Sequence, residues 1–554
     1  MNPLCTTTRC DEPELSLAQA VVASLLRAGV DEVVVCAGAR NAALVAVLAA
    51  TPALRLWSFP EERSAAFFAL GRALSLDAPV SVVTTSGTAV AELLPAVIEA
   101  HYQGVPLVLL TADRPRAYRG TGAPQAIEQA GLFGPYVHAA GDVAGVEDLA
   151  GFEKTLSAWD RRRPVHLNVC LEEPSAAALA LAQSAAAEPR PAPARVRSNP
   201  ALVETFLADT AAGPLVAVVA ALPAAEQAPV ARFLRRLGCP VIAEATSGLR
   251  EAPELAGQRV PAAESTLARL PVGRVLRIGA VPSSRWWRDL EKRPGVFVLS
   301  LTPAGFPGLA RPSLVADFPE WDRLRVPAGQ GSPATVADPA ASEVEAPSAT
   351  LRDHPRSEPA LIHALSAAIP PGSLVFLGNS LPIREWNVFA TTHPRSLRCH
   401  ANRGANGIDG IVSTFLGLGA DEVESWAVIG DLTALYDLAA LWITPSLPPA
   451  RRRIAVVNNG GGRIFARVAA LRGMAAEPQR LMQNPHTLGF RAWADMFGWT
   501  HVPAATAGEI AAAARRPEPN VLLEISPCPA QTEAAWATLS PDHGTSEPSH
   551  PAAS

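Results

Sequence analysis

The stretch RRIAVVNNGGGRIFA (residues 452–466) joins a short apolar run to three consecutive glycines. The run IAVV (454–457) is typical of a strand that is buried on both faces of a parallel sheet. Two asparagines and three glycines (458–462) follow it at once. Such glycines permit either a close approach of another group to the backbone or a tight connection into a helix. The run matches neither GxGxxG nor a P-loop, so taken alone it leaves both interpretations open.

The preceding predicted strand supplies a second polar turn. In SWAVIGDLTALYDLAAL (425–441), Gly430 and Asp431 follow the apolar residues of a strand. Asp431 and Asn459 are 28 positions apart, which leaves room for one crossover helix and a return to a neighbouring parallel strand. The carboxyl ends of such strands meet at one edge of the sheet. A carboxylate, an amide oxygen and exposed carbonyls there would suit Mg²⁺, and the glycines would admit a diphosphate. The pattern therefore predicts a site for a metal-bound diphosphate.

The rest of the chain repeats the alternation of strand and helix. Two stretches rich in proline and alanine, around 186–201 and 326–350, read as linkers. The blocks between them predict an α/β fold with three doubly wound parallel-sheet domains. The expected boundaries are 13–185 for the first domain, 200–327 for the central domain, 352–530 for the third domain and 531–554 for a disordered tail.

Composition excludes several classes of protein. The chain has 554 residues and 49% hydrophobic residues, yet no run of about 20 apolar residues that would span a membrane. Its N-terminus lacks the pattern of a secretory signal. The seven cysteines form no CxxC pair and no zinc cluster, and the formal net charge is -5. We expect a cytoplasmic protein that has no membrane span and binds no nucleic acid.

The two polar turns together resemble a known signature. GDLTALYD, followed by VVNNGG, is similar to the GDG-to-NN signature of thiamine-diphosphate enzymes. The resemblance implies thiamine diphosphate and Mg²⁺ as cofactors, with Mn²⁺ as an alternative ion. It also implies that Asp431, the side chain of Asn459 and the backbone of Gly461 are the metal ligands. Gly460 stands where family members often have a further asparagine, but this position is not a ligand. The first domain would then bind the aminopyrimidine ring (PYR domain) and the third the diphosphate (PP domain).

Thiamine chemistry also needs a carboxylic acid at the aminopyrimidine ring. In LWSFPEERSAAFFALG (56–71), Glu61 and Glu62 lie between a strand and a helix, where two acids are also expected simply to favour the helix dipole. The resemblance, aligned through FFALG, selects Glu62 as the catalytic acid. It implies that Ile408, in NRGANGIDG (402–410), holds the cofactor bent. The other cofactor contacts that it implies are Asn379, Gly430, Leu432, Thr433 and Ile464.

A narrower resemblance rests on seven motifs. TSGTAVAELLPAVIEA, LTADRP, TGAPQAIEQAGLFGPYV, GNSLPIREW, NRGANGIDG, GDLTALYDL and NNGGGRIF occur in the order of the MenD family, from about residue 15 to 500. These transferases are the 2-succinyl-5-enolpyruvyl-6-hydroxy-3-cyclohexene-1-carboxylate (SEPHCHC) synthases of menaquinone biosynthesis. The resemblance implies decarboxylation of 2-oxoglutarate and conjugate addition of the resulting carbanion to isochorismate. It also implies a homodimer or a dimer of dimers, with each active site between two chains.

Arginines fit the substrates of this family. Both substrates are dianions, and arginine binds planar carboxylates in a bidentate manner. Any single arginine is equally well explained as a surface charge, but five occur at predicted strand-end turns. The residues that match substrate contacts of the family are Arg40, Arg114, Gln125, Arg285, Ser380, Arg384, Arg403 and Phe465.

Three positions depart from the family pattern. Ala39 in CAGARN (36–41), Pro124 and Ser284 replace a serine, an asparagine and a lysine. Each loses a hydrogen-bonding side chain near a substrate, typically worth about 1 to 3 kcal/mol if it is buried. We expect these changes to affect substrate affinity rather than thiamine chemistry.

Two alternatives remain at this stage. One is another thiamine-diphosphate decarboxylase or carboligase, such as an acetohydroxyacid synthase, which takes smaller and less charged substrates. The arginines and the lack of a dinucleotide fingerprint in the central block speak against it. The other alternative is a catalytically silent scaffold, which would be expected to have lost Glu62, Asp431 or Asn459.

Overall fold

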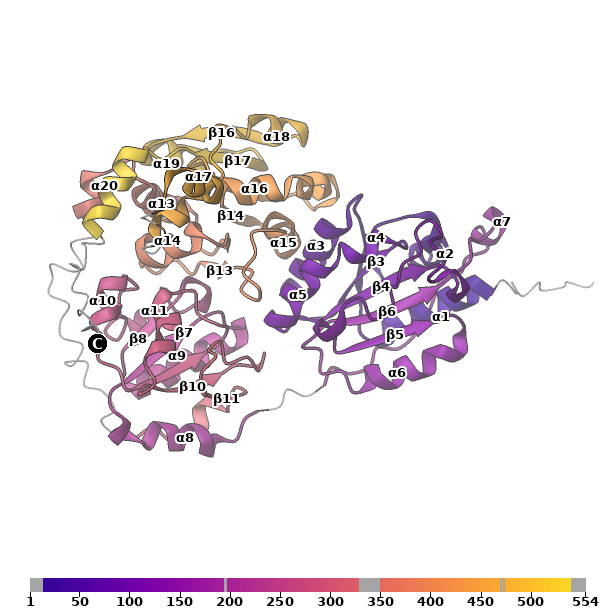
Figure 1. Ribbon diagram of the computed structural model, residues 1–554, viewed down its shortest axis with the longest axis horizontal. Coiled ribbons are helices and arrows are strands. Elements are labelled where there is room, and N and C mark those ends of the chain that lie inside the picture. The colour runs from indigo at the N-terminus through magenta and orange to yellow at the C-terminus, as the bar shows by residue number, and fades with distance from the viewer. Residues whose placement is uncertain (1–12, 194–196, 328–348, 469–470, 472–473, 540–554) are drawn as a thin grey trace, which may run out of the picture.

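The computed structural model describes residues 13–193, 197–327, 349–468, 471 and 474–539. It contains three sheets whose strands are all parallel (Figure 1). The predicted α/β fold with three parallel-sheet domains is thereby confirmed. No helix in the described ranges is long and apolar enough to cross a membrane.

The first domain has a six-stranded sheet in the order β2-β1-β3-β4-β6-β5. Alternate residues of its strands enter two different cores: Val34 and Val82 pack on one face, Val33 and Val83 on the other. This burial on both faces explains the continuous apolar runs of the sequence. The strands are β1 (Glu32–Val35), β2 (Arg55–Ser58), β3 (Val80–Thr84), β4 (Leu107–Asp113), β5 (Ala139–Val143) and β6 (Val165–Cys170). The helices are α1 (Pro13–Arg27), α2 (Ala42–Ala49), α3 (Glu62–Leu76), α4 (Thr88–Ala91), α5 (Leu94–Gln103), α6 (Leu149–Ser157) and α7 (Ala176–Leu179).

The central domain has five strands in the order β11-β10-β9-β7-β8. Its strands are β7 (Leu215–Val219), β8 (Val241–Ala243), β9 (Arg274–Ile278), β10 (Phe297–Leu301) and β11 (Leu314–Ala316). Its helices are α8 (Pro200–Ala208), α9 (Ala224–Leu237), α10 (Glu264–Arg269) and α11 (Arg285–Asp289), with the short turn η6 (Ala245–Ser247) after β8.

The third domain repeats the plan of the first, with the order β13-β12-β14-β15-β17-β16. Its strands are β12 (Leu374–Leu377), β13 (Arg398–His400), β14 (Glu424–Gly430), β15 (Arg451–Val457), β16 (Thr500–Ala504) and β17 (Asn520–Ile525). Its helices are α13 (Glu358–Ala368), α14 (Leu381–Phe389), α15 (Ile411–Leu418), α16 (Asp431–Tyr436), α17 (Ala476–Gln483), α18 (Arg491–Met496), α19 (Ala507–Ala514) and α20 (Pro529–Leu539). The 3-10 segments η11 (Leu438–Ser446) and η12 (Arg463–Arg467) follow α16 and β15.

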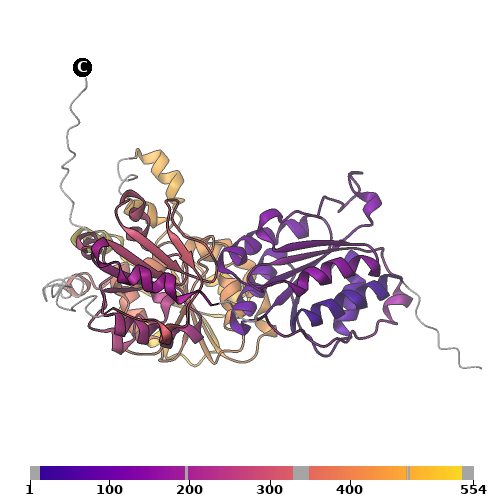
Figure 2. The same cartoon turned by 90° about the horizontal axis from the view of Figure 1, so that it is seen from below.

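Helices α3 and α15 join the first domain to the third, and Figures 1 and 2 show the first domain beside the other two. Two glycines allow this close crossing. A Cβ at Gly71 would lie 2.2 Å from the carbonyl oxygen of Thr414, and one at Gly417 would lie 2.2 Å from that of Phe68. One hydrophobic core therefore runs through both domains.

The prediction of a disordered tail is wrong for residues 531–539, which belong to helix α20. Trp536 packs edge-on against Phe389 with ring centroids 5.5 Å apart, and Arg467 lies over the Trp536 ring. Arg467 also pairs with Glu533 at 2.7 Å. These tertiary contacts order a helix whose own sequence carries little amphipathic pattern. Residues 540–554 lie outside the described residues, as does most of the expected linker around 326–350.

Candidate functional site

The two polar turns that the sequence singled out meet at one edge of the third sheet. Strands β14 and β15 pair in parallel, with Gly430 opposite Val457. Asp431, at the start of α16, accepts hydrogen bonds on Oδ2 from the backbone N–H groups of Gly460 (2.8 Å) and Gly461 (2.9 Å). The predicted convergence of the two strand ends is therefore present.

The backbone conformation alone already requires glycine in this turn. Gly460 has φ 77° and Gly461 has φ 129°, conformations that L side chains rarely adopt. A Cβ at Gly461 would also lie 2.6 Å from the carbonyl oxygen of Gln483. A side chain here would disrupt the turn even without a ligand, so the tight-turn interpretation and the ligand interpretation both hold.

Within the described part of the chain, the side-chain amide of Asn459 is hydrogen-bonded through its nitrogen but not through its oxygen. Its Nδ2 donates to both carboxylate oxygens of Glu358, at 3.1 Å each. Its Oδ1 is buried and has no hydrogen-bond partner among the described residues. An unpaired buried acceptor costs about 1 to 3 kcal/mol, so this oxygen calls for a ligand. With the nearby carboxylate of Asp431, it offers the oxygen donors that a hard divalent cation takes.

Glu358 fixes which end of the Asn459 amide faces the site. It is almost fully buried at the start of α13, and its N–H donates to Thr532 Oγ1 of α20 at 3.0 Å. Burial raises the pKa of the Glu358 carboxyl above its ordinary range. In its ionised form this carboxyl only accepts hydrogen bonds, so Asn459 turns its NH₂ group toward both Glu358 oxygens and its own oxygen away.

His486 also lies close to the carboxylate of Asp431. Its Nε2 lies 3.4 Å from Asp431 Oδ2. The N–H of Leu488 donates to His486 Nδ1 at 3.2 Å, which assigns the ring proton to Nε2, facing Asp431. The imidazole therefore places a hydrogen-bond donor next to the oxygen atoms of Asp431 and Asn459 that suit a metal ion.

The structure separates the two acids of the first domain. Glu61 is the N-cap of α3, and its carboxylate accepts from the N–H groups of Arg63 (2.9 Å) and Ser64 (2.8 Å). Glu62 is the first residue of the helix, and burial raises the pKa of its carboxyl, with the charges of Glu61 and Glu92 adding to the effect. Capping is thus the task of Glu61, while Glu62 has the raised pKa that suits an acid or base in catalysis. Its catalytic role stays a prediction.

A loop of the third domain brings two predicted site residues together. Asn379 Nδ2 donates to the carbonyl oxygens of Asn402 (2.9 Å) and Gly407 (2.7 Å), and Arg403 Nη1 donates to Asn379 Oδ1 at 2.8 Å. Ile408 follows directly. The loop thus carries a candidate substrate arginine and the candidate cofactor wedge.

The other predicted cofactor contacts surround Asp431. Leu432 N–H donates to Asp431 Oδ1 at 2.6 Å, and Thr433 is buried one residue further on. Ile464 and Phe465 are half-buried in η12, after the glycine turn.

Comparison with known proteins agrees with this geometry. A family model for the N-terminal TPP binding domain of thiamine pyrophosphate enzymes matches residues 15–132. A SEPHCHC synthase of Akkermansia muciniphila is 42% identical over 525 residues, which cover 94% of this chain and 97% of that protein. A SEPHCHC synthase of Bdellovibrio bacteriovorus is 39% identical, with 88% and 91% covered, and one of Geobacillus kaustophilus is 33% identical, with 87% and 89% covered.

The chain belongs to the SEPHCHC synthase family. The resemblance read from the seven motifs is thereby confirmed, and the acetohydroxyacid synthase alternative loses its support.

The substrate residues expected in a SEPHCHC synthase fall into two groups. The first group, Arg40, Arg114 and Gln125, belongs to the first domain. Arg40 is 6% exposed and donates to Leu171 O (3.0 Å) and Glu173 Oε1 (2.9 Å), just before α7. Arg114 lies over the ring of Tyr118, and Gln125, with φ 56°, packs next to Gly87 at the start of α4.

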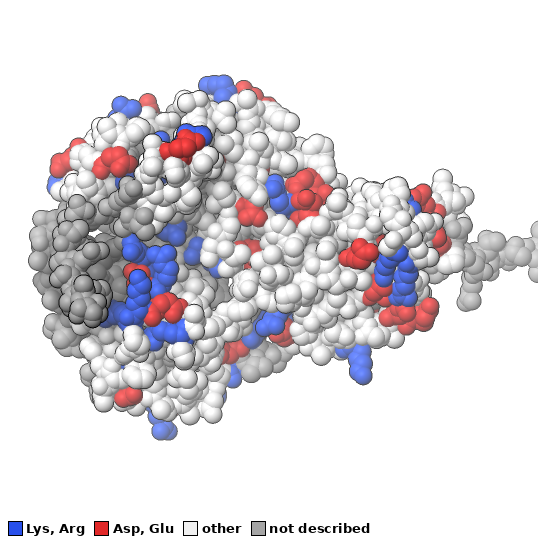
Figure 3. Space-filling view, in the orientation of Figure 1, with Lys and Arg blue, Asp and Glu red and all other residues white. Residues whose placement is uncertain are grey.

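The second group lies at the contact between the central and third domains. Arg384 in α14 is exposed and donates to Ser380 O at 2.5 Å, and Ser380 has φ 72°. Arg285 begins α11, and this turn is tied to α14 by a 3.0 Å hydrogen bond from Asn387 Nδ2 to Ser283 Oγ. Figure 3 shows Lys and Arg side chains gathered in the hollow between these two domains.

The two groups are far apart within one chain. Figure 1 shows α7, next to Arg40, at one end of the molecule and α11, which carries Arg285, toward the other. A single chain in this conformation does not bring all the predicted substrate residues into one pocket.

One departure from the family pattern has a structural consequence. At Ser284 the backbone N–H donates to Glu244 Oε1 at 3.1 Å, while its hydroxyl oxygen is buried without a partner among the described residues. Glu244 also accepts from the N–H and hydroxyl of Ser283. This buried carboxylate orders the turn before Arg285, and sequence reasoning missed it, as it missed Glu358 and His486.

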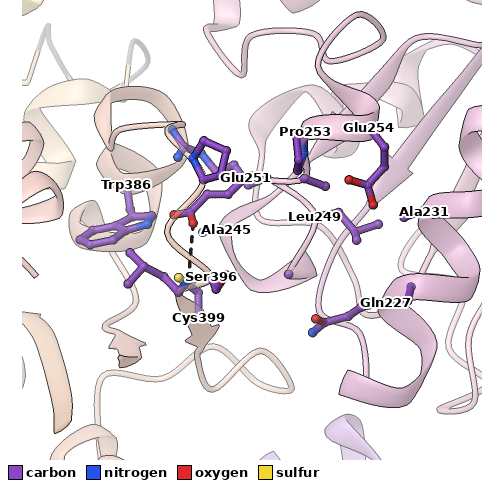
Figure 4. Close-up of a pocket in the computed structure, with 16 residues that line it drawn as sticks. Gln227, Ala231, Ala245, Leu249, Glu251, Pro253, Glu254, Trp386, Ser396 and Cys399 are labelled. Carbon is purple, nitrogen blue, oxygen red and sulfur yellow. Dashed lines mark hydrogen bonds between the residues drawn. The ribbon is translucent and has the colours of Figure 1, made fainter. Parts of the chain in front are cut away.

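A cavity also lies between the central and third domains, next to α14, the helix that carries Arg384. Its volume is about 250 Å³, and the residues that line it include Gln227, Leu249, Glu251, Trp386 and Cys399 (Figure 4). Glu251 accepts from the N–H groups of Arg395 and Leu397, so its carboxylate already serves to join the two domains.

Proposed function

We propose that the protein is a SEPHCHC synthase that uses thiamine diphosphate and Mg²⁺ to join 2-oxoglutarate to isochorismate with loss of carbon dioxide. The observation that carries this proposal is the buried, unpartnered Oδ1 of Asn459 beside Asp431, at the position that the family signature reserves for the metal. Relatives that bear this name match nearly the whole chain.

The residues of the third domain have defined tasks in this proposal. Asp431, Asn459 Oδ1 and the backbone of Gly461 would hold Mg²⁺, with Mn²⁺ as an alternative. The remaining contacts to the cofactor come from Asn379, Ile408, Gly430, Leu432, Thr433 and Ile464. Thiamine diphosphate, when bound, would supply a cationic thiazolium ring that stabilises the electron pair left on the substrate when carbon dioxide departs.

Glu62 is the proton-transfer residue in this proposal. Burial raises the pKa of its carboxyl above the ordinary range of a glutamate, which favours its protonated form and suits a proton-transfer group. With the cofactor bound, this carboxyl would donate a proton to, or accept one from, a ring nitrogen of the aminopyrimidine.

The arginines select the substrates. Arg285, Arg384 and Arg403, with Ser380, hold substrate carboxylates from the central and third domains, and Phe465 closes the pocket. Arg40, Arg114 and Gln125 come from the first domain of a second chain. The separation of the two groups within one chain supports such a site between chains, and hence a homodimer or a dimer of dimers.

A direct assay tests the proposal. The purified protein is incubated with thiamine diphosphate, Mg²⁺, 2-oxoglutarate and isochorismate, and loss of isochorismate absorbance is followed while the product is identified by mass spectrometry. Turnover should require all four additions. If pyruvate serves as well as 2-oxoglutarate, the assignment is wrong, because pyruvate lacks the distal carboxylate that a cation would hold.

Arg384→Ala should lower kcat/KM for the substrates by about 10- to 150-fold, which corresponds to one charge-assisted hydrogen bond of about 1.5 to 3 kcal/mol. The affinity for thiamine diphosphate should stay nearly unchanged, because the guanidinium serves a substrate carboxylate. Steady-state kinetics and calorimetry measure the two quantities. Arg288→Ala, which removes another exposed arginine from the neighbouring helix α11, is the control and should change neither.

Glu358→Gln should weaken Mg²⁺ binding about 10-fold. A glutamine can present its own NH₂ group to Asn459, so the amide no longer has a reason to keep Oδ1 toward the metal. Titration of Mg²⁺ in the presence of thiamine diphosphate, followed by calorimetry, measures the change. Glu518→Gln, which alters a carboxylate that pairs with Arg516 just before β17, should leave the affinity as in wild type.

A further inference from the structure

Glu99 holds a loop of a different domain. It lies in α5 of the first domain and is 3% exposed. Its Oε1 accepts from Gly404 N–H at 2.6 Å, and its Oε2 accepts from Ala405 N–H (2.7 Å) and Asn406 N–H (3.3 Å). Three successive backbone N–H groups that converge on one carboxylate form an anion-binding nest, here filled by a side chain of the same protein.

Among the described residues of its own domain, no side chain supports the centre of the loop in a comparable way. Asn379 binds the carbonyl oxygens at its two ends, residues 402 and 407. The N–H groups of 404–406, between those ends, point to Glu99. A Cβ at Gly404 would lie 2.4 Å from the carbonyl oxygen of Glu99, so the backbones of α5 and the loop are themselves in close contact.

The held loop carries residues of the proposed active site. Arg403 immediately precedes the three N–H groups, is 9% exposed and donates to Asn379. Ile408 lies two residues after them. A shift of the loop would therefore move a substrate arginine and the residue that bends the cofactor together.

From these contacts we infer that Glu99 is a positioning residue: its carboxylate fixes the loop 402–407 and thereby sets the direction of Arg403 toward the substrate. The inference rests on the proposed function for the role of Arg403, but not for the contact itself. Gln103, one turn further along α5, donates to Glu99 and to Asn402 Oδ1 (3.5 Å), which holds the carboxylate in place. The first domain thus contributes to the geometry of the third within one chain, separately from any residue it lends to a partner.

A purely structural role is the competing explanation, and the same domain contact offers a matched control. Asp421 accepts from Arg72 Nη2 of α3 at 2.7 Å and from Arg55 at 3.0 Å, so it joins the same two domains without touching the loop. Asp421→Asn removes this cross-domain ion pair, just as Glu99→Gln removes the charge at the loop.

The test has two readouts. Hydrogen–deuterium exchange of the unliganded protein should be at least about 10-fold faster at residues 404–406 in Glu99→Gln than in wild type, and unchanged there in Asp421→Asn. In kinetics, Glu99→Gln should raise KM for one of the two substrates about 10-fold with a smaller change in kcat, whereas Asp421→Asn should leave both constants as in wild type.

Each outcome decides between the explanations. Unchanged exchange in the loop, or an equal rise in KM for both variants, would overturn the inference. Should Glu99→Gln not yield folded protein, Glu99→Asp, which keeps the charge but withdraws it by one methylene, is subject to the same two measurements and the same criteria. A third outcome would be faster loop exchange in Glu99→Gln while the wild type does not turn over isochorismate. The contact of Glu99 with the loop would then be supported, and the proposed function would be refuted.

Discussion

Mixing two inactive variants is expected to restore about a quarter of wild-type activity. Glu62→Gln and Asp431→Asn should each lower kcat by at least about 100-fold, because one removes the proton-transfer group and the other a charged metal ligand. If each site combines the first domain of one chain with the third domain of its partner, a mixed dimer has one site with both wild-type residues and one with neither. Random pairing makes half of the dimers mixed, and each of these has one good site in two.

The measurement is a steady-state assay before and after incubation of the two variants together. Native mass spectrometry confirms the exchange of subunits independently. Glu62→Gln mixed with itself is the control and should gain nothing. If exchange is seen and the activity remains the sum of the two parents, each site lies within a single chain and the proposed architecture is refuted.

The second large effect concerns the cofactor. Asp431→Asn should weaken the binding of thiamine diphosphate in the presence of Mg²⁺ on the order of 100-fold, about 3 kcal/mol. In the structure Oδ1 accepts from Leu432 N–H and Oδ2 from the N–H groups of Gly460 and Gly461. An asparagine must place its NH₂ group against one of these donors, so the turn opens in addition to the loss of a charged ligand.

Calorimetric titration of the cofactor at fixed Mg²⁺ checks this prediction. Asp437→Asn is a matched control at the other end of α16, where the carboxylate accepts from Ser413 rather than from the glycine turn. An unchanged affinity in Asp431→Asn would remove this residue from the metal site.

The sequence was sufficient for those parts of the site that depend on strand ends. Asp431 and Asn459 each follow an apolar parallel strand, and the geometry of parallel sheets alone brings such residues to one edge. The three-domain fold could be predicted for the same reason, because buried strands alternate with helices throughout the chain.

Residues that act across long sequence separations could not be predicted. Glu358 is 101 positions from Asn459, and Glu99 is 305 positions from Gly404. Each is one acid on an otherwise ordinary helix, so no local pattern marks its partner. Helix α20 was missed for a related reason: its order comes from contacts such as that of Trp536 with Phe389, not from its own sequence.

The crossing of α3 and α15 has a consequence for engineering. Because Gly71 and Gly417 bring the two backbones into contact and the core continues across them, the first and third domains are not interchangeable modules, although each has a sheet of its own. A chimera that takes its first domain from a relative would have to import α15 together with α3. If α3 and α15 came from different proteins, even a methyl group at either glycine position would force the two helices apart and disrupt the shared core.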